Sequence, residues 1–132
     1  MILVDTTFLI DLQRSARNEH YQAALLWLQQ HEAVEIVLPA IVLGEFAEGF
    51  ENVDHPVVQH YRRAHRIIDM DKKVAMIYSR ISRDLRRRGQ SIGANDTWIA
   101  ATALSLDAPL LTNNISHFER VEGLEVIGYA QD

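Results

Sequence analysis

The chain has 132 residues and a net charge of −5 at neutral pH with histidine counted as neutral. That length suits one domain, residues 1–132, whose core is large enough to need no disulfide or metal staple. The absence of cysteine excludes disulfides, thiolate catalysis and cysteine-ligated zinc, and it is compatible with a reducing compartment. The sequence shows no signal peptide and no apolar stretch of membrane-spanning length, so we expect a cytoplasmic protein with no membrane partner.

Short apolar runs bounded by polar or turn residues are typical of strands buried on both faces of a sheet. We expect such strands at 1–4, 35–38, 67–70, 109–112 and 124–127. Apolar residues at helical spacing fill the intervals between them. We expect helices at 6–12, 19–31, 41–53, 56–66, 71–88 and 96–106. This alternation predicts an α/β fold with a mainly parallel sheet, because helices of this length make the crossovers between parallel strands.

Three acidic residues occupy equivalent places in this pattern. Asp5 ends the first strand, Glu45 lies early in the helix after the second, and Asp96 opens a nearly all-apolar helix that we place in the interior. A parallel sheet would gather them at its carboxyl edge, where ligands bind. Crowded carboxylates favour a cation, and oxygen ligands favour Mg²⁺ or Mn²⁺. Taken alone, Asp5 fits equally well as the cap of a helix that starts at Thr6 or Thr7.

Four short motifs follow one another along the chain. They are Val4-Asp5-Thr6, Gly44-Glu45-Phe46 with Gly49, Asn95-Asp96 with Ile99-Ala100-Ala101, and Leu111-Thr112-Asn113-Asn114 with Phe118. In this order the motifs resemble those of the PIN-domain ribonucleases, and among these the VapC-type toxins of bacterial toxin–antitoxin pairs. The resemblance spans nearly the whole chain. It implies a PIN-like three-layer fold in which helices flank a central, mainly parallel sheet of about four or five strands.

The resemblance also implies a function, a metal-dependent endoribonuclease in which water activated by Mg²⁺ or Mn²⁺ attacks an RNA phosphodiester. A homodimer and a cognate VapB-type antitoxin are the implied protein partners. Carried over residue by residue, Asp5 and Asp96 would be the main metal ligands. Glu45 would orient the water or complete the coordination, and Thr6 and Thr112 would support the site through their hydroxyls.

Asn114 departs from the family pattern, because many members have a fourth aspartate at this position. Its amide oxygen would still bind the metal or its water but adds no charge, so we expect one firmly held ion. The missing acid supports an alternative, a weakly active or inactive protein that acts mainly as an antitoxin-binding module. A phosphatase that uses Asp5 as nucleophile is disfavoured, because haloacid-dehalogenase-like enzymes need a second aspartate where this chain has Thr7.

A dense group of arginines stands out in this acidic chain. Five fall within nine residues, at positions 80, 83, 86, 87 and 88. Helical phasing places Arg80, Arg83 and Arg87 opposite the apolar stripe of their helix. There they would either bind RNA phosphates or remain solvated, in part paired with Asp84.

Two further groups of polar residues receive simpler interpretations. Glu48 lies one helical turn from Glu45, and we expect it in solvent. The six histidines lack metal-ligand spacing, because His60 and His65 are five residues apart. We expect His117, which stands singly in the sequence, at the surface.

Overall fold

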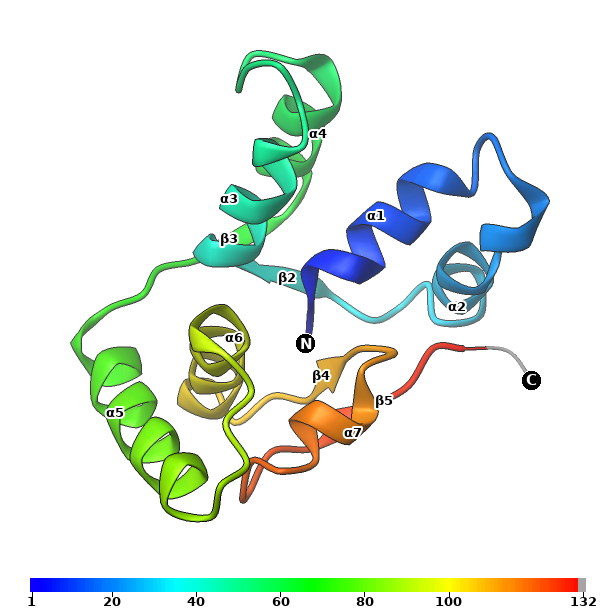
Figure 1. Cartoon of the computed structure of the whole chain (residues 1–132). Helices are drawn as coiled ribbons and strands as arrows, with labels where there is room; N and C mark the ends of the chain where they lie inside the picture. Colours follow the sequence, from blue (N-terminus) through cyan, green and yellow to red (C-terminus); the bar gives the residue numbers. More distant parts are fainter. Residues whose placement is uncertain (131–132) are drawn as a thin grey trace.

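The computed structural model describes residues 1–130 as a five-stranded, all-parallel sheet between two layers of helices (Figure 1). The strands are β1 (Ile2–Val4), β2 (Ile36–Pro39), β3 (Arg66–Ile68), β4 (Leu110–Leu111) and β5 (Val126–Ile127). The helices are α1 (Thr6–Arg14), the 3₁₀ turn η1 (Glu19–Tyr21), α2 (Ala23–Gln30), α3 (Ala40–Glu48), α4 (Pro56–Ala64), α5 (Lys72–Arg87), α6 (Ala94–Ser105) and α7 (Ile115–Phe118). None of the helices within the described range could span a membrane. The α/β fold predicted from the sequence is confirmed.

The strand order β3-β2-β1-β4-β5 places the two halves of the chain on opposite sides of β1. From β1 the chain moves outward through β2 to β3, with α1 to α4 on one face of the sheet (Figure 1). It then returns by α5 and α6 to β4, on the other side of β1, and continues to β5. The direction of travel therefore reverses between β1 and β4. In parallel sheets such a reversal opens a crevice beyond the carboxyl ends of the two strands, where ligands bind.

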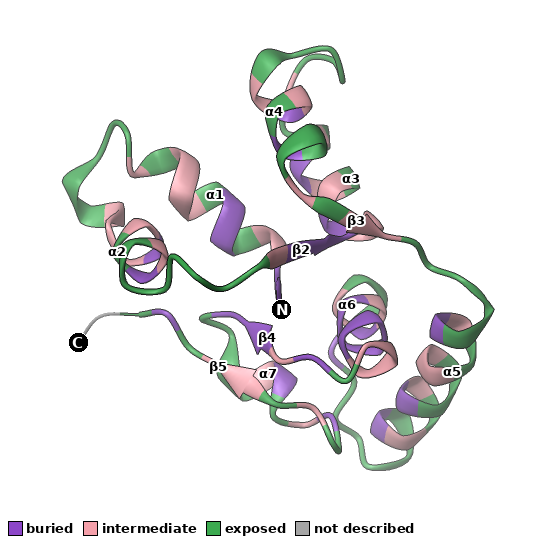
Figure 2. Ribbon diagram, turned by 180° about the vertical axis from the view of Figure 1, so that it is seen from behind, coloured by how far each residue is buried: buried purple, intermediate pink, exposed green. Residues whose placement is uncertain are grey.

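The central strands are the most deeply buried part of the molecule (Figure 2). Leu3 and Val4 of β1 and Leu110 and Leu111 of β4 have no exposed surface. Both faces of these strands are covered by helices, which explains why their sequences are apolar without alternation. The edge strands β3 and β5 are only half-buried or exposed. The unbroken apolar run before Asp5 thus marks the centre of the sheet.

The structure corrects several predicted helix boundaries. The helix expected at 19–31 is divided, because the Gln22 side chain donates to the carbonyl of Ser15, over 2.9 Å, as the chain turns between η1 and α2. The interior helix begins two residues before Asp96, after Gly93 adopts a φ of +93° that only glycine takes readily. The short helix α7 was not predicted, because four residues are too few for a helical pattern.

The longest helix, α5, shows each signal that defined it in the sequence. The Asp71 carboxylate accepts a hydrogen bond of 3.0 Å from the backbone N–H of Val74 and caps the first turn. Ile81 and Leu85 are buried on the face that packs against α6. Gly89, with a φ of +66°, ends the helix.

We expect Asp71→Ala to lower the free energy of unfolding by about 1 kcal/mol, because it removes the only side-chain acceptor at this cap. Urea unfolding followed by circular dichroism measures this change. Asp69→Ala is the matched control, because Asp69 is exposed two residues earlier and caps no helix within residues 1–130. Equal losses in the two variants would contradict the cap assignment.

Candidate functional site

Asp5 lies at the switch point, directly after β1 and beside the end of β4. Only 5% of its surface is exposed. One carboxylate oxygen accepts a hydrogen bond of 3.1 Å from the backbone N–H of Phe8, so Asp5 does cap α1. The other oxygen accepts a hydrogen bond of 2.5 Å from the Thr112 hydroxyl, at the end of β4. The two roles considered for Asp5, helix cap and site carboxylate, are therefore compatible in one side chain.

Burial makes ionisation of Asp5 costly. Loss of hydration raises the pKa of Asp5 from its ordinary 3.8 to about 6, against the opposing effect of the hydrogen bonds from Thr112 and Phe8. The negative charges of Asp96 and Asp11 raise the pKa of Asp5 further. A cation near these carboxylates would relieve both effects.

Asp96 lies in the first turn of α6, half-buried at the same edge of the sheet. Burial raises the pKa of Asp96, the nearby His117 opposes this rise, and Glu45 adds to it. The charge of Asp96 thus raises the pKa of Asp5, and the charge of Glu45 raises the pKa of Asp96. Asp96 therefore lies electrostatically between the other two predicted carboxylates, and we name the three together the carboxylate site: Asp5, Glu45 and Asp96.

Glu45 is held in place from two sides. One carboxylate oxygen accepts a hydrogen bond of 2.8 Å from the Thr6 hydroxyl, and the other accepts one of 3.0 Å from the side-chain amide of Asn95. Asn95, which precedes Asp96 in its motif, was not among the predicted site residues. Glu48 is exposed on the same helix, as predicted.

Thr112 connects Asp5 to the loop that carries Asn114. The Thr112 hydroxyl accepts a hydrogen bond of 2.9 Å from the backbone N–H of Asn114 and donates its own hydrogen to Asp5. The Asn114 residue is exposed, and its side chain does not cap α7. Asn114 thus adjoins the Asp5–Thr112 pair through its backbone, while the residue itself is exposed.

His117 was predicted at the surface, and this prediction was wrong for the inner edge of its ring. Its Nδ1 atom is buried and has no hydrogen-bond partner within residues 1–130. The atom lies 3.6 Å from Oδ2 of Asp96, too long for a hydrogen bond but close enough for electrostatic interaction. The sequence pattern carries no signal for the approach of His117 to Asp96, because His117 belongs to α7, a helix that the pattern does not predict.

Tyr129 and Asp11 form a second contact that the sequence did not indicate. The buried Tyr129 hydroxyl donates a hydrogen bond of 2.7 Å to Oδ2 of Asp11, and its ring meets the Phe8 ring edge-on with centroids 5.0 Å apart. Burial, strengthened by the bond to Asp11, raises the pKa of the Tyr129 hydroxyl well above its usual range. Tyr129 thus holds α1 in place, the helix whose first turn Asp5 caps.

The donor chemistry of the carboxylate site fits a hard divalent cation. It offers three carboxylates, two of them with raised pKa values. No three acidic or histidine side chains among residues 1–130 lie close enough together, as they stand, to enclose an ion. Mg²⁺ does not require enclosure, because it retains several waters and usually binds only one or two carboxylates directly. A hydrated ion is therefore the species that these residues fit.

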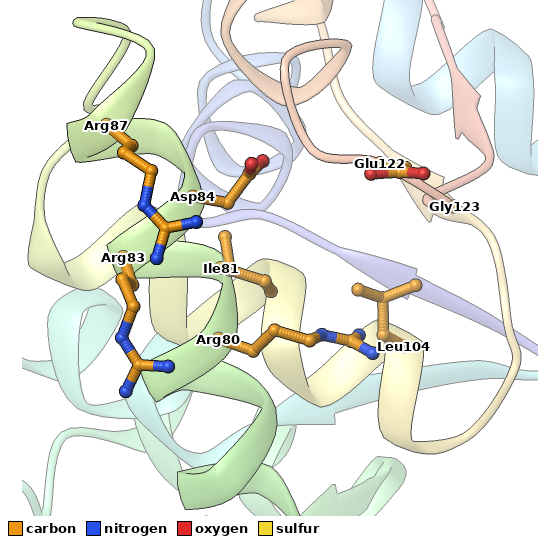
Figure 3. Close-up of a pocket in the computed structure, with 8 residues that line it drawn as sticks. All are labelled: Arg80, Ile81, Arg83, Asp84, Arg87, Leu104, Glu122 and Gly123. Carbon is orange, nitrogen blue, oxygen red and sulfur yellow. The ribbon is translucent and has the colours of Figure 1, made fainter.

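The predicted arginines lie apart from this site. Arg80, Arg83 and Arg87 are exposed on α5 and line a separate groove that contains none of the three carboxylates (Figure 3). Pairing with Asp84, which was one interpretation of these arginines, is instead made by Arg88 at 2.8 Å.

The fold and the carboxylate site define a three-layer α/β domain with acidic side chains at its switch point. A family model for the PIN domain matches residues 2–124. The chain therefore belongs to the PIN-domain family.

Curated relatives within this family carry the name ribonuclease VapC. Ribonuclease VapC1 of Methanocaldococcus jannaschii is 33% identical over 128 residues, covering 95% of this chain and 85% of that protein. Ribonuclease VapC1 of Rickettsia felis is 28% identical over 134 residues, covering 96% of this chain and 94% of that protein.

Solved structures agree with the fold over the whole chain. VapBC2 from Rickettsia felis, bound to a promoter DNA fragment, matches with a TM-score of 0.80 at 26% identity, covering 98% of this chain and 100% of that chain. VapBC-1 from nontypeable Haemophilus influenzae matches with a TM-score of 0.80 at 26% identity, covering 99% of this chain and 100% of that chain.

The raised pKa of Asp5 predicts a pH-dependent stability of the metal-free protein. The folded state retains the Asp5 proton up to about pH 6, whereas the unfolded chain loses it near 3.8. The folded state binds more protons in this window, so the free energy of unfolding should fall by up to about 3 kcal/mol as the pH rises through it. Urea unfolding at several pH values measures the fall. Asp5→Asn should remove this dependence of the free energy of unfolding on pH. An unchanged pH profile in that variant would contradict the assignment of the dependence to Asp5.

Proposed function

We propose that this chain is a VapC-type toxin, an endoribonuclease that hydrolyses RNA phosphodiester bonds with the help of Mg²⁺ or Mn²⁺. The observation that carries the proposal is the convergence of Asp5, Glu45 and Asp96 at the switch point of the sheet. Family membership and relatives named ribonuclease VapC support it. An RNA substrate implies a cytoplasmic site of action.

The proposed roles follow from the contacts of each side chain. Asp5 and Asp96 would hold the cation, which when bound would activate water and neutralise charge on the phosphate. Hydrogen bonds from Thr112 and from the N–H of Phe8 fix the orientation of Asp5, as partners of a metal-binding carboxylate commonly do.

Glu45 would orient the attacking water through its carboxylate, which Thr6 and Asn95 already hold in one position. The water oxygen would form a bond to phosphorus while the bond from phosphorus to one ribose oxygen breaks. The departing oxygen takes up a proton, so hydrolysis leaves two shorter strands. Asn114 would contribute its amide oxygen at the rim without adding charge.

Purified, antitoxin-free protein should cut total cellular RNA at discrete positions when Mg²⁺ or Mn²⁺ is present, and chelator should abolish the cuts. Asp96→Asn and Glu45→Gln should each reduce the cleavage rate by about 100-fold or more, because the first removes a carboxylate that holds the cation and the second removes the carboxylate that orients the attacking water. Gel electrophoresis of labelled RNA measures the rates. Glu48→Gln is the matched control and should cleave at the wild-type rate.

Calorimetry with Mn²⁺ separates the two ways in which this proposal can fail. Asp5→Asn should weaken Mn²⁺ binding, and unchanged affinity would show that the metal ligands are misassigned. Intact Mn²⁺ binding without cleavage of any RNA would favour the second candidate function, an antitoxin-binding module with little activity. The neutral Asn114 at a position often acidic in the family is the observation that favours that alternative.

We also propose that the chain forms a homodimer and binds a VapB-type antitoxin. The solved structures of VapBC complexes that share its fold support the second partner. Light scattering of the isolated protein at working concentration should give twice the mass of one chain. A monomeric mass would contradict the homodimer and leave the ribonuclease proposal intact.

A further inference from the structure

A groove outside the carboxylate site is walled by arginines that have no function so far. Arg80, Arg83 and Arg87 project from α5 on one side of it (Figure 3). The facing residues are Leu104, near the end of α6, and the turn Glu122–Gly123 before β5. We name this feature the arginine groove.

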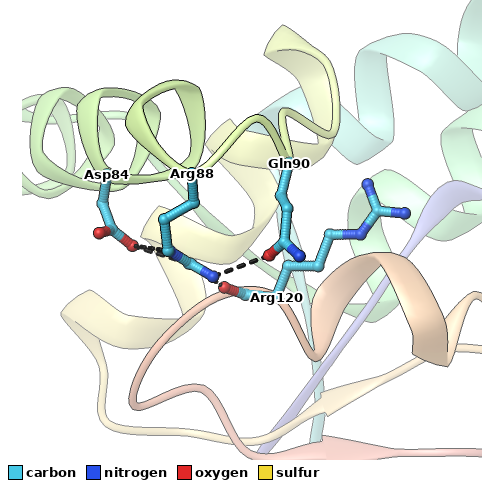
Figure 4. Close-up of polar contacts among 4 residues, drawn as sticks. All are labelled: Asp84, Arg88, Gln90 and Arg120. Carbon is cyan, nitrogen blue, oxygen red and sulfur yellow. Dashed lines mark hydrogen bonds and ion pairs between the residues drawn. The ribbon is translucent and has the colours of Figure 1, made fainter.

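Among residues 1–130, the three arginines of the groove form no side-chain hydrogen bond or ion pair, in contrast to a neighbouring arginine, Arg88. Arg88 is fully engaged: its guanidinium donates to Asp84, to the side-chain oxygen of Gln90 over 2.8 Å and to the backbone carbonyl of Arg120 over 2.6 Å (Figure 4). This network ties the end of α5 to the loop after α7. Arg88 therefore has a structural role and is not available to a ligand.

Asp84 also lines the groove, and Arg88, which lies outside it, balances the Asp84 carboxylate in an ion pair of 2.8 Å. Hydrogen bonds from Arg88 hold the pKa of Asp84 below its usual range, and Arg87 adds only a smaller effect without forming an ion pair. Within residues 1–130, none of Arg80, Arg83 and Arg87 forms an ion pair. The lining of the groove therefore carries three guanidinium groups and two carboxylates, Asp84 and Glu122, and Asp84 is already paired with Arg88. In a chain with a net charge of −5, this gives a local positive potential along the α5 wall.

The spacing of these groups indicates an extended anion. Residues at i, i+3 and i+7 share one face of a helix and span about 10 Å along its axis at roughly 1.5 Å per residue. A single small anion would have to draw the three long side chains together from along that length. A polymer with regularly spaced charges can contact all three without drawing them together, and the planar guanidinium fork matches phosphate oxygens in two parallel hydrogen bonds.

We propose that the arginine groove binds the phosphate backbone of single-stranded RNA, with the strand running along the α5 wall. The proposal deepens the function proposed above, because the bound strand would be the RNA that the carboxylate site cuts. Glu122 stands on the opposite wall and repels phosphate, which confines the strand to the arginine side. Removing the Glu122 charge should therefore tighten binding, whereas removing the arginines should weaken it.

The test measures binding without cleavage. The full chain carrying Asp96→Asn, kept in chelator, is titrated into a labelled single-stranded uridine RNA of about 20 nucleotides, long enough to cover a groove of this kind. Fluorescence anisotropy gives the dissociation constant over a series of salt concentrations. Each of Arg80→Ala, Arg83→Ala and Arg87→Ala should weaken binding by about tenfold, the loss typical of one charge-assisted contact. Each should also reduce the slope of log affinity against log salt by about 0.7.

Arg86→Ala is the matched control, because Arg86 is exposed on the same helix but does not line the groove. It should leave the salt slope unchanged, and Glu122→Gln should tighten binding. Thermal unfolding checks that every variant is folded. Equal weakening by Arg86→Ala and the groove variants would overturn the proposal, because it would show a response to total charge alone.

Two further outcomes separate this proposal from the proposed function. If the wild-type protein cleaves RNA but the groove variants bind it unchanged, the groove assignment is wrong and the ribonuclease stands. If binding depends on the groove but no RNA is cut with metal present, the groove assignment stands and the ribonuclease fails. Groove variants that change the mass in light scattering without changing RNA affinity would instead make this face an interface between protein chains, which overturns the proposal.

Discussion

The hydrogen bond from the Thr112 hydroxyl to the buried Asp5 carboxylate joins the two central strands at the point where the sheet reverses direction. A carboxylate with so little exposure is costly to bury, and this bond together with the Phe8 N–H offsets part of the cost. The same contacts fix the start of α1 and the loop after β4. Stability of the centre and geometry of the site are therefore coupled through the contacts of one side chain, Asp5.

Much of the fold followed from local patterns in the sequence. The apolar run before Asp5 identified the central strand, and the Asp71 cap and Gly89 stop defined α5. The positions of Asp5, Glu45 and Asp96 at strand and helix ends indicated that they would meet, because parallel strands place their carboxyl ends together. These inferences depend only on residues close together in sequence and on the regular geometry of parallel sheets.

Other parts of the site depend on contacts between remote segments, which periodicity does not encode. Tyr129 reaches Asp11 across 118 positions of sequence, and His117 approaches Asp96 from a helix too short to show a pattern. The pairing of Asp84 was also open, because several arginines lie within one turn and only packing against the loop after α7 selects Arg88. Side-chain partners of this kind are settled by tertiary packing.

Asp5 and Thr112 are separated by 107 positions of sequence. This separation constrains when, during synthesis, the protein can form its carboxylate site. A ribosome adds residues in order, and domains fold as units once their distant segments can pair. A nascent chain that ends before β4 lacks the strand that pairs with one side of β1 and the Thr112 hydroxyl that donates to Asp5. The carboxylate site can therefore reach its final geometry only after synthesis has passed β4 and Thr112.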